Sequence, residues 1–394
     1  MIDDLIKNNK IKIFFQPIVS IKDKKIFAME ALTRAYDDNN KVISPLHLFK
    51  QAKEEKLSCR LDDYVRELAI RNFQDYIKDD NDLLLFLNFE PAIIDNNLAA
   101  NFKHVVSKYN IEPKNIVIEI KEDSIKKNSC LKKFVTDYRE DGFIIAIDDF
   151  GTGYSSFERL ALIKPDIVKI DRSIIYDIHN NFINTEILNS ISNMCHKIGA
   201  MVLSEGVEHK EEVLTCMKKD IDIFQGFYFC KATKTLESST KQHIDSRIAD
   251  IGNQYKSLVK QHINEKQSLL KSSKLLLQKI ITIFESCNLN CFNEIKKILS
   301  NESKLQAIYI LDEVNGRQIG KTIIQSKVTP LYKPSKDGHD HSLKEYYYIA
   351  KASSQGDYLS PKYISKATGN ICRTYSHKIV LNNFKYILCC DIVG

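Results

Sequence analysis

The sequence contains no tryptophan, only 13 glycines and 8 prolines among 394 residues, and no run of apolar residues that approaches a membrane span. A spanning helix needs about 20 mostly apolar residues. The first four residues lack the basic and apolar regions of a signal peptide. There is also no internal repeat and no low-complexity tract. We therefore expect a cytosolic, globular protein without a membrane span, long enough for two domains.

The ten cysteines are scattered along the chain and form no C-x-x-C pairs. A disulfide framework or a thiolate zinc site would show closely spaced or paired cysteines. In a chain of this length without an export signal, the cysteines are expected to be reduced thiols.

The net charge of +6 is distributed unevenly along the chain. Residues 241–394 carry 23 Lys and Arg against 13 Asp and Glu, whereas residues 1–240 have a slight acidic excess. The basic residues are spread over a long helical pattern and a folded segment and are not clustered with aromatic residues. This distribution favours a solvated helix face, and no nucleic acid polymer is expected as a partner.

Short apolar runs alternate with amphipathic stretches from residue 13 to about residue 229. The predicted strands are 13–19, 27–32, 83–88, 116–120, 143–148, 167–170, 201–204 and 223–229. The predicted helices are 45–73, 93–109, 131–140, 182–198 and 211–219. Such repeated alternation predicts an α/β fold, a modified (β/α)8 TIM barrel. The turn-like residues 20–25 leave no helix between the first two strands, which departs from a perfect eightfold repeat.

Polar residues occur at the same end of nearly every predicted strand. They are Glu30, Asn88, Glu119, Asp148, Lys169 and Glu205, with Gln225 inside the last run. The carboxyl ends of barrel strands converge on the face where active sites are built. We therefore expect these seven side chains to lie together.

Two adjacent carboxylates, Asp148 and Asp149, open into a glycine-containing loop at residues 150–156. Neighbouring like charges are costly unless a cation neutralises them. Carboxylate and amide oxygens, with no His or Cys, are the ligands of hard divalent ions such as Mg²⁺ or Mn²⁺. Sites of this kind favour phosphoryl chemistry, with one or two ions bound to the phosphate and the nucleophilic water.

Six short motifs resemble those of the EAL domain family in order and spacing across residues 10–235. They are Gln16-Pro17-Ile18-Val19, Glu30-Ala31-Leu32, Asp148-Asp149-Phe150-Gly151-Thr152-Gly153, Lys169-Ile170-Asp171, Glu205-Gly206-Val207-Glu208 and Gln225-Gly226-Phe227. The resemblance implies a modified β/α barrel that hydrolyses cyclic di-GMP to linear pGpG with Mg²⁺ or Mn²⁺.

The resemblance also implies roles for individual residues. Metal ligands would be Glu30, Asn88, Glu119, Asp148, Asp149 and Glu205, and catalytic residues would be Lys169, Glu205, Glu122 and Gln225. Lys169 would position or deprotonate the attacking water, and Glu122 would anchor the loop after the Asp pair. Gln16, Arg34 and Asp171 would contact the substrate. For Glu122, Asp171 and Glu208, structural ion pairing is the alternative.

Three departures from the family pattern keep two other functions open. Ala35 stands where the family often has Trp, Glu90 adds a carboxylate near the Asn88 motif, and the segment after Phe229 lacks a frequent proline. None removes a metal ligand. The alternatives are a cyclic di-GMP receptor without turnover, and a scaffold that acts through partner binding.

The spacing of apolar residues changes near residue 241. Apolar residues spaced 4-3-4-3 from Ile244 to Leu258 predict a long helix with coiled-coil or helix-packing character. We predict an EAL domain over 1–240, a helical connector over 241–303 and a small α+β domain over 304–394. The last resembles a PAS/Cache-like sensor or dimerisation module. Its tyrosines, among them Tyr346 and Tyr363, would line a ligand pocket or form core, and the protein is expected to be a homodimer.

Overall fold

The computed structural model describes residues 1–89, 94, 102–121, 128–151, 157–287, 292–302, 304–325, 333–354, 356–365 and 367–393. Within these residues the chain forms two compact units, residues 1–259 and 260–394. No helix in the described part of the chain is both long and apolar enough to cross a membrane. The predicted three-part division, with its functional labels, stays a prediction.

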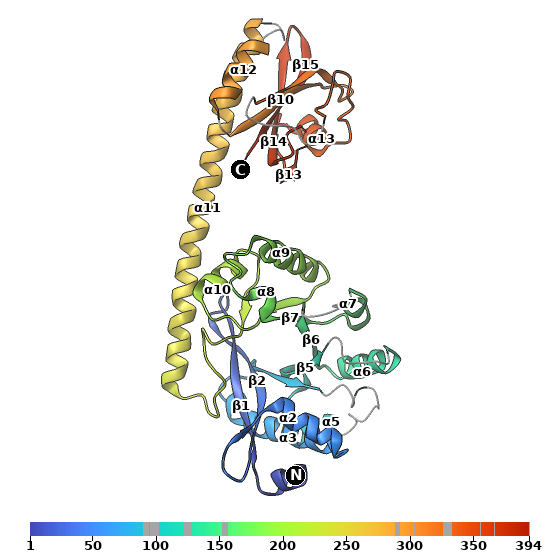
Figure 1. The fold of residues 1–394 in the computed structure, drawn as a ribbon, viewed down its shortest axis with the longest axis vertical. Coiled ribbons are helices and arrows are strands. Elements are labelled where there is room, and N and C mark those ends of the chain that lie inside the picture. The colour runs from blue at the N-terminus through green and yellow to red at the C-terminus, as the bar shows by residue number, and fades with distance from the viewer. Residues whose placement is uncertain are drawn as a thin grey trace. The chain divides into compact units, whose positions relative to one another are not determined.

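The first unit is a closed, mostly parallel barrel (Figure 1). Its strands are β1 (Ile11–Ser20), β2 (Lys25–Tyr36), β4 (Leu84–Asn88), β5 (Ile116–Lys121), β6 (Ile144–Phe150), β7 (Ile167–Ile170), β8 (Met201–Ser204) and β9 (Ile223–Phe224). β1 is antiparallel to both β2 and β9, and this pairing closes the barrel. The predicted barrel and its irregular first repeat are confirmed. The short β3 (Val42–Ile43) pairs antiparallel with the end of β2.

One helix precedes the first barrel strand, and the other helices of this unit follow strands. The helices are α1 (Ile2–Lys7), α2 (Pro45–Glu54), α3 (Ser58–Ile77), α5 (Phe102–Lys108), α6 (Asn128–Glu140), α7 (Phe157–Ile163), α8 (Arg172–Ile175), α9 (Phe182–Lys197) and α10 (Lys210–Met217), with a 3-10 turn at Pro113–Asn115. Side-chain caps define the starts of two helices. At α2 the Ser44 hydroxyl accepts a hydrogen bond from His47 N, and Pro45 occupies the first helical position. At α9 the Asn181 side chain accepts a hydrogen bond from Asn184 N.

Two predicted elements of the barrel were wrong in extent. The helix expected over 45–73 is two helices, because Lys56 adopts a left-handed φ of 58° and α3 restarts at Ser58. The strand expected over 223–229 ends at Phe224, and the following residues fold back on Val207 through backbone hydrogen bonds from Val207 and Tyr228. Periodicity alone does not reveal such local breaks.

The barrel interior holds a small apolar cluster, separate from the larger core between strands and helices. The interior cluster consists of Ile18, Ala28, Leu84, Phe86, Val117, Ala146, Ile167, Leu203 and Ile223. Successive strand residues face opposite sides, so alternate residues face the interior and the intervening ones pack under the helices. This register determines where the next inward-facing residues lie.

The helix α11 (Ser238–Cys287) is a single helix of 50 residues, as the 4-3-4-3 spacing indicated (Figure 1). Its first apolar residues, Ile244, Ile248 and Ile251, are buried in the core of the first unit. Helix packing therefore accounts for this part of the pattern. Near its end, Leu277, Ile280 and Phe284 belong to the core of the second unit.

The second unit is an antiparallel sheet with helices, ordered β11-β10-β15-β14-β12, with β13 on β14. Its elements are α12 (Phe292–Asn301), β10 (Leu305–Asp312), β11 (Gln318–Ile324), α13 (Glu345–Ala352), β12 (Asp357–Leu359), β13 (Tyr363–Ile364), β14 (Ile371–Leu381) and β15 (Phe384–Ile392). The predicted α+β architecture of this segment is present, whereas strand β14 was not predicted.

Candidate active site

The polar residues expected at strand ends form a layer directly beyond the interior apolar cluster. Glu119 follows Val117 by two residues, and the same offset of two relates Asp148 to Ala146 and Lys169 to Ile167. A period of two keeps the side chain on the same face of a strand. Each polar group is therefore directed into the barrel mouth, and Asn88 lies beside Glu119 in the parallel register.

Lys169 lies at the centre of this layer and is only 1% exposed. Its ammonium is 2.8 Å from an Asp148 oxygen, 2.6 Å from Glu205 and 3.8 Å from Glu30, and it also pairs with Glu119. One lysine therefore faces four carboxylates. The cluster has an excess of negative charge inside a buried site, which a further cation would relieve.

Burial and mutual charge shift the titration of these groups. Burial raises the pKa of Glu205 to about 8, although Lys169 opposes it. Burial also holds the pKa of Glu119 well above its usual value. At Asp148 the effect of burial is outweighed by Lys169, which lowers the pKa of that carboxyl. Burial disfavours the ammonium of Lys169, but the surrounding carboxylates raise its pKa well above the ordinary value.

Glu30 is held between two amides at the edge of the cluster. Gln225 Nε2 donates to one of its oxygens at 2.5 Å, and Asn88 Nδ2 donates to the other at 3.2 Å. The Gln225 Oε1 atom and the Glu119 Oε2 atom are buried without a hydrogen-bond partner among the residues that the structure describes. Buried acceptors of this kind require a donor or a cation.

Asp149 reaches the same site by an unusual backbone conformation. In an extended strand Asp148 and Asp149 would point to opposite faces, but Asp149 has a φ of 57° and the β6–β7 register is broken there. Ligand oxygens of Asp148, Asp149 and Glu205 consequently lie within 4.8 Å of one another. Asp149 is also 2.8 Å from Nζ of Lys121, a residue that lies in none of the six motifs.

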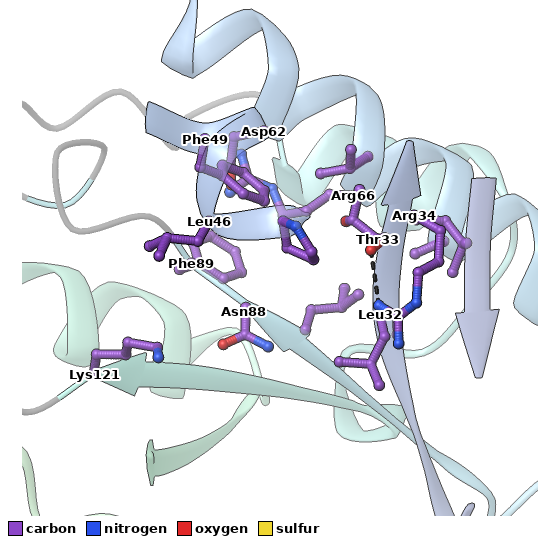
Figure 2. A pocket seen from close by; sticks show the side chains of 16 residues that line it. Leu32, Thr33, Arg34, Leu46, Phe49, Asp62, Arg66, Asn88, Phe89 and Lys121 are labelled. Carbon is purple, nitrogen blue, oxygen red and sulfur yellow. Dashed lines mark hydrogen bonds and ion pairs between the residues drawn. The ribbon is translucent and has the colours of Figure 1, made fainter. Parts of the chain in front are cut away.

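A cavity of about 440 Å³ is lined mainly by residues of β2, α2, α3 and the end of β4 (Figure 2). Figure 2 shows Leu46, Phe49 and Phe89 grouped on one side of it and Arg34 on the other. Asn88 lines this cavity and also donates to Glu30, so the cavity and the acidic cluster adjoin. The aromatic residues at this wall were not predicted from the sequence.

The wall of the cavity contains a buried cation. Arg66, 2% exposed, pairs with Asp62 one helical turn earlier, and its guanidinium lies 4.3 Å from the centre of the Phe89 ring. The Asp62–Arg66 spacing of four residues on α3 is the sequence signal for this pair.

The other predicted site residues have identifiable contacts. Gln16 Nε2 donates to Cys230 O at 3.1 Å, and Asp171 caps α8 by accepting a hydrogen bond from Ser173 N at 2.7 Å. Glu208 pairs with Arg172, which is the structural alternative considered for it. Their proposed roles toward substrate stay predictions. Glu122, Glu90 and residues 152–156 lie outside the described residues.

The donor set fits a hard divalent cation. The buried Glu119 oxygen lacks a hydrogen-bond partner among described residues, and three carboxylates offer oxygens to one point. All the candidate ligands are oxygen donors, which suits Mg²⁺ or Mn²⁺. Lys169 alone neutralises only part of the charge.

The EAL domain family model matches residues 1–232. The chain is 28% identical over 230 residues to the signaling protein YkoW of Bacillus subtilis, covering 58% of this chain and 29% of that protein. It is 26% identical over 232 residues to the probable cyclic di-GMP phosphodiesterase PdeB of Escherichia coli, covering 59% and 44%. The chain therefore spans less than half the length of these two relatives.

A likeness to YkuI of Bacillus subtilis extends over nearly the whole chain. The sequences are 24% identical over 376 residues, covering 92% of this chain and 90% of YkuI. The YkuI crystal structure, a complex with the substrate c-di-GMP and calcium, covers 100% of this chain and 99% of that chain with a TM-score of 0.84 and 22% identity. At this identity the structural likeness shows a shared fold for both units.

Proposed function

The chain belongs to the EAL domain family, and from this we propose that it hydrolyses cyclic di-GMP to linear pGpG in a reaction that depends on Mg²⁺ or Mn²⁺. The observation that carries the proposal is the buried cluster of four carboxylates around Lys169 at the barrel mouth. Relatives named as cyclic di-GMP phosphodiesterases, such as PdeA of Borreliella burgdorferi, support it.

The cavity beside the cluster would hold one guanosine half of the substrate. Phe49 offers aromatic surface to a purine ring, and the Arg34 guanidinium offers charge to a phosphate. Because Asn88 belongs to both the cavity and the cluster, a base bound here would place its phosphate next to the carboxylates.

Glu30, Asn88, Glu119, Asp148, Asp149 and Glu205 would hold the divalent ions. When bound, such an ion neutralises phosphate charge and makes a water molecule more acidic. The protein contributes the orientation of these ligands, since Gln225 and Asn88 fix both oxygens of Glu30.

Lys169 would position the attacking water and stabilise negative charge that develops on the phosphate. Its carboxylate neighbours keep it protonated by raising its pKa well above the usual value, although burial acts in the opposite direction. A protonated ammonium donates hydrogen bonds and accepts none. Of the two roles predicted for Lys169, the structure favours positioning, and a neighbouring carboxylate would accept the proton.

The test is incubation of the purified chain with cyclic di-GMP and Mg²⁺ or Mn²⁺, followed by separation of the nucleotides. We expect pGpG that requires the ion and disappears in Glu30→Ala. The matched control is Glu140→Ala, which changes an exposed residue at the end of α6. Tight binding of cyclic di-GMP without product would contradict the proposal and indicate a receptor.

We also propose that the protein is a cytosolic homodimer whose residues 304–394 form a PAS/Cache-like module. Large apolar side chains exposed at the starts of α7 and α9, among them Phe157, Phe182 and Ile183, support self-association. Light scattering on the full chain would test the dimer, and charged substitutions of Phe182 and Ile183 would be expected to yield monomers.

A further inference from the structure

The second unit contains a cavity of about 310 Å³ that the proposed phosphodiesterase reaction does not use. Its floor is formed by buried side chains from β10, α13 and β15, namely Tyr309, Tyr346 and Asp391, with His341 beside them. A volume near 300 Å³ is the lower range for small-molecule sites. The dimensions therefore suit a small molecule and are too small for a folded partner.

The floor of this cavity carries a buried carboxylate. Asp391 is 1% exposed, and its two oxygens accept hydrogen bonds from Ser365 Oγ at 2.7 Å, Thr374 Oγ1 at 2.9 Å, Tyr363 OH at 3.3 Å and Tyr309 OH at 3.4 Å. These hydroxyl donors favour the ionised carboxylate and oppose the effect of burial, which raises the pKa of Asp391. Among the described residues, no Lys, Arg or His forms an ion pair with it.

The hydrogen-bond directions leave acceptors facing the cavity. Gln318 Oε1 accepts from His341 Nε2 at 3.2 Å, so the neutral imidazole accepts at Nδ1 from Tyr346 OH at 2.7 Å. Burial supports this neutral form, because it lowers the pKa of His341 to about 4. The hydroxyl proton of Tyr309 is directed to Asp391, and that of Tyr363 is shared between Thr374 Oγ1 at 2.6 Å and Asp391 at 3.3 Å. The three tyrosine oxygens therefore present lone pairs.

The tyrosine rings add a second attraction for a cation. Tyr346 and Tyr363 are nearly parallel at 6.4 Å between ring centres, and Tyr309 meets Tyr346 edge-on at 6.0 Å. The faces of aromatic rings attract cations, most strongly where water is excluded. At the mouth of the cavity, Lys344, Glu345 and Lys362 are exposed.

We propose that this cavity binds a small organic molecule through a protonated amine, which is placed against Asp391 and the tyrosine oxygens. The ammonium supplies the donors and the positive charge that the floor lacks. The ligand is either a free amine or an amino acid, whose carboxylate would face the lysines at the mouth.

Isothermal titration calorimetry on the full chain tests the proposal, in phosphate buffer because Tris is itself a primary amine. The probes are ethanolamine, n-butylamine, 2-phenylethylamine and phenylalanine, with 2-phenylethanol and 3-phenylpropionate as matched compounds without an amine. We expect saturable binding of at least one amine, and binding about tenfold or more weaker for the alcohol and the acid. Comparison of phenylalanine with 2-phenylethylamine distinguishes the amino acid from the free amine. Absence of binding by all four amines, or equal binding of the alcohol or the acid, would overturn the proposal.

Asp391→Asn removes the charge and keeps the shape, so we expect amine affinity to fall about tenfold or more. Tyr363→Phe removes one acceptor and is measured as a second variant. If circular dichroism shows that Asp391→Asn does not fold, the amine affinity of Tyr363→Phe decides the test. The control Asp312→Asn changes a turn residue that accepts from Val314 N and Asn315 N and does not line the cavity. Unchanged amine affinity in a folded Asp391→Asn, or in Tyr363→Phe where that variant decides, contradicts the assignment.

Discussion

Lys169 and Asp148 form an ion pair of 2.8 Å across the ends of two adjacent parallel strands, with Lys169 1% and Asp148 5% exposed. The pair is the centre of the acidic cluster, because the same ammonium also contacts Glu30, Glu119 and Glu205. Removal of this one cation leaves four carboxylates facing each other. The stability of the barrel mouth and its chemistry therefore depend on the same side chain.

We expect Lys169→Met to reduce both stability and activity. Removing one partner of a buried ion pair costs about 3–5 kcal/mol, and loss of a group that acts on the transition state lowers kcat by about 10²–10⁴-fold. Urea denaturation and a pGpG assay would measure the two effects. Lys197→Met, an exposed change near the end of α9, is the control and should alter neither. Normal turnover by Lys169→Met would refute the assigned role.

Binding of Mn²⁺ at pH 7 should release about one proton or more. Burial raises the pKa of Glu205 to about 8, so this carboxyl is largely protonated at pH 7 and must lose its proton to ligate an ion. Apparent Mn²⁺ affinity should consequently rise between pH 6 and about 8. Calorimetry in two buffers of different ionisation enthalpy measures the release, and Glu205→Gln should reduce it. Identical binding enthalpies in both buffers would count against this explanation.

Gly226→Ala should destabilise the first unit by about 2–4 kcal/mol. A Cβ atom at this position would collide with the backbone of Val207, which cannot move as a side chain can. The displaced neighbour is Gln225, which donates to Glu30, so activity should fall as well. Thermal unfolding and the pGpG assay test both.

The matched control is Gly252→Ala, because a Cβ there on α11 meets open space. This variant should be more stable by about 0.5–1 kcal/mol, since alanine has the higher helix propensity. Equal effects of the two alanines would show that the close approach to Val207 is not what constrains Gly226.

Arg34→Ala should raise KM for cyclic di-GMP by about tenfold with a smaller change in kcat. Arg34 lines the cavity and is absent from the contacts around Lys169, so it would act in binding and not in the chemical step. Arg60→Ala, which breaks a surface ion pair with Asp3, should leave both constants unchanged. A fall in kcat with constant KM would place Arg34 in the chemistry instead.

The strand pattern and the polar residues at strand ends sufficed to predict the barrel and most of the cluster. Glu119 follows Val117, and Asp148 follows Ala146, at an offset of two positions, and this spacing can be read directly from the sequence. The aromatic wall at Phe49 and Phe89 could not be predicted in this way, because it combines residues from α2 and the end of β4 that share no motif. The role of Asp391 could not be predicted from the sequence either. In the sequence it resembles an ordinary strand residue, and only the structure shows that Ser365 and Thr374 donate hydrogen bonds to it.

By itself, the sequence determined which side chains enter the barrel, because the period of two along each strand is a local property of the backbone. It also determined the oxygen donor set and the long helix from Ser238. Only the tertiary structure decided how Asp148 and Asp149 reach the same site, through the left-handed φ of 57° at Asp149. It also decided that Lys169 would face four carboxylates, since their mutual distances depend on closure of the barrel between β1 and β9. Closure of the barrel is a long-range event, which no local pattern specifies.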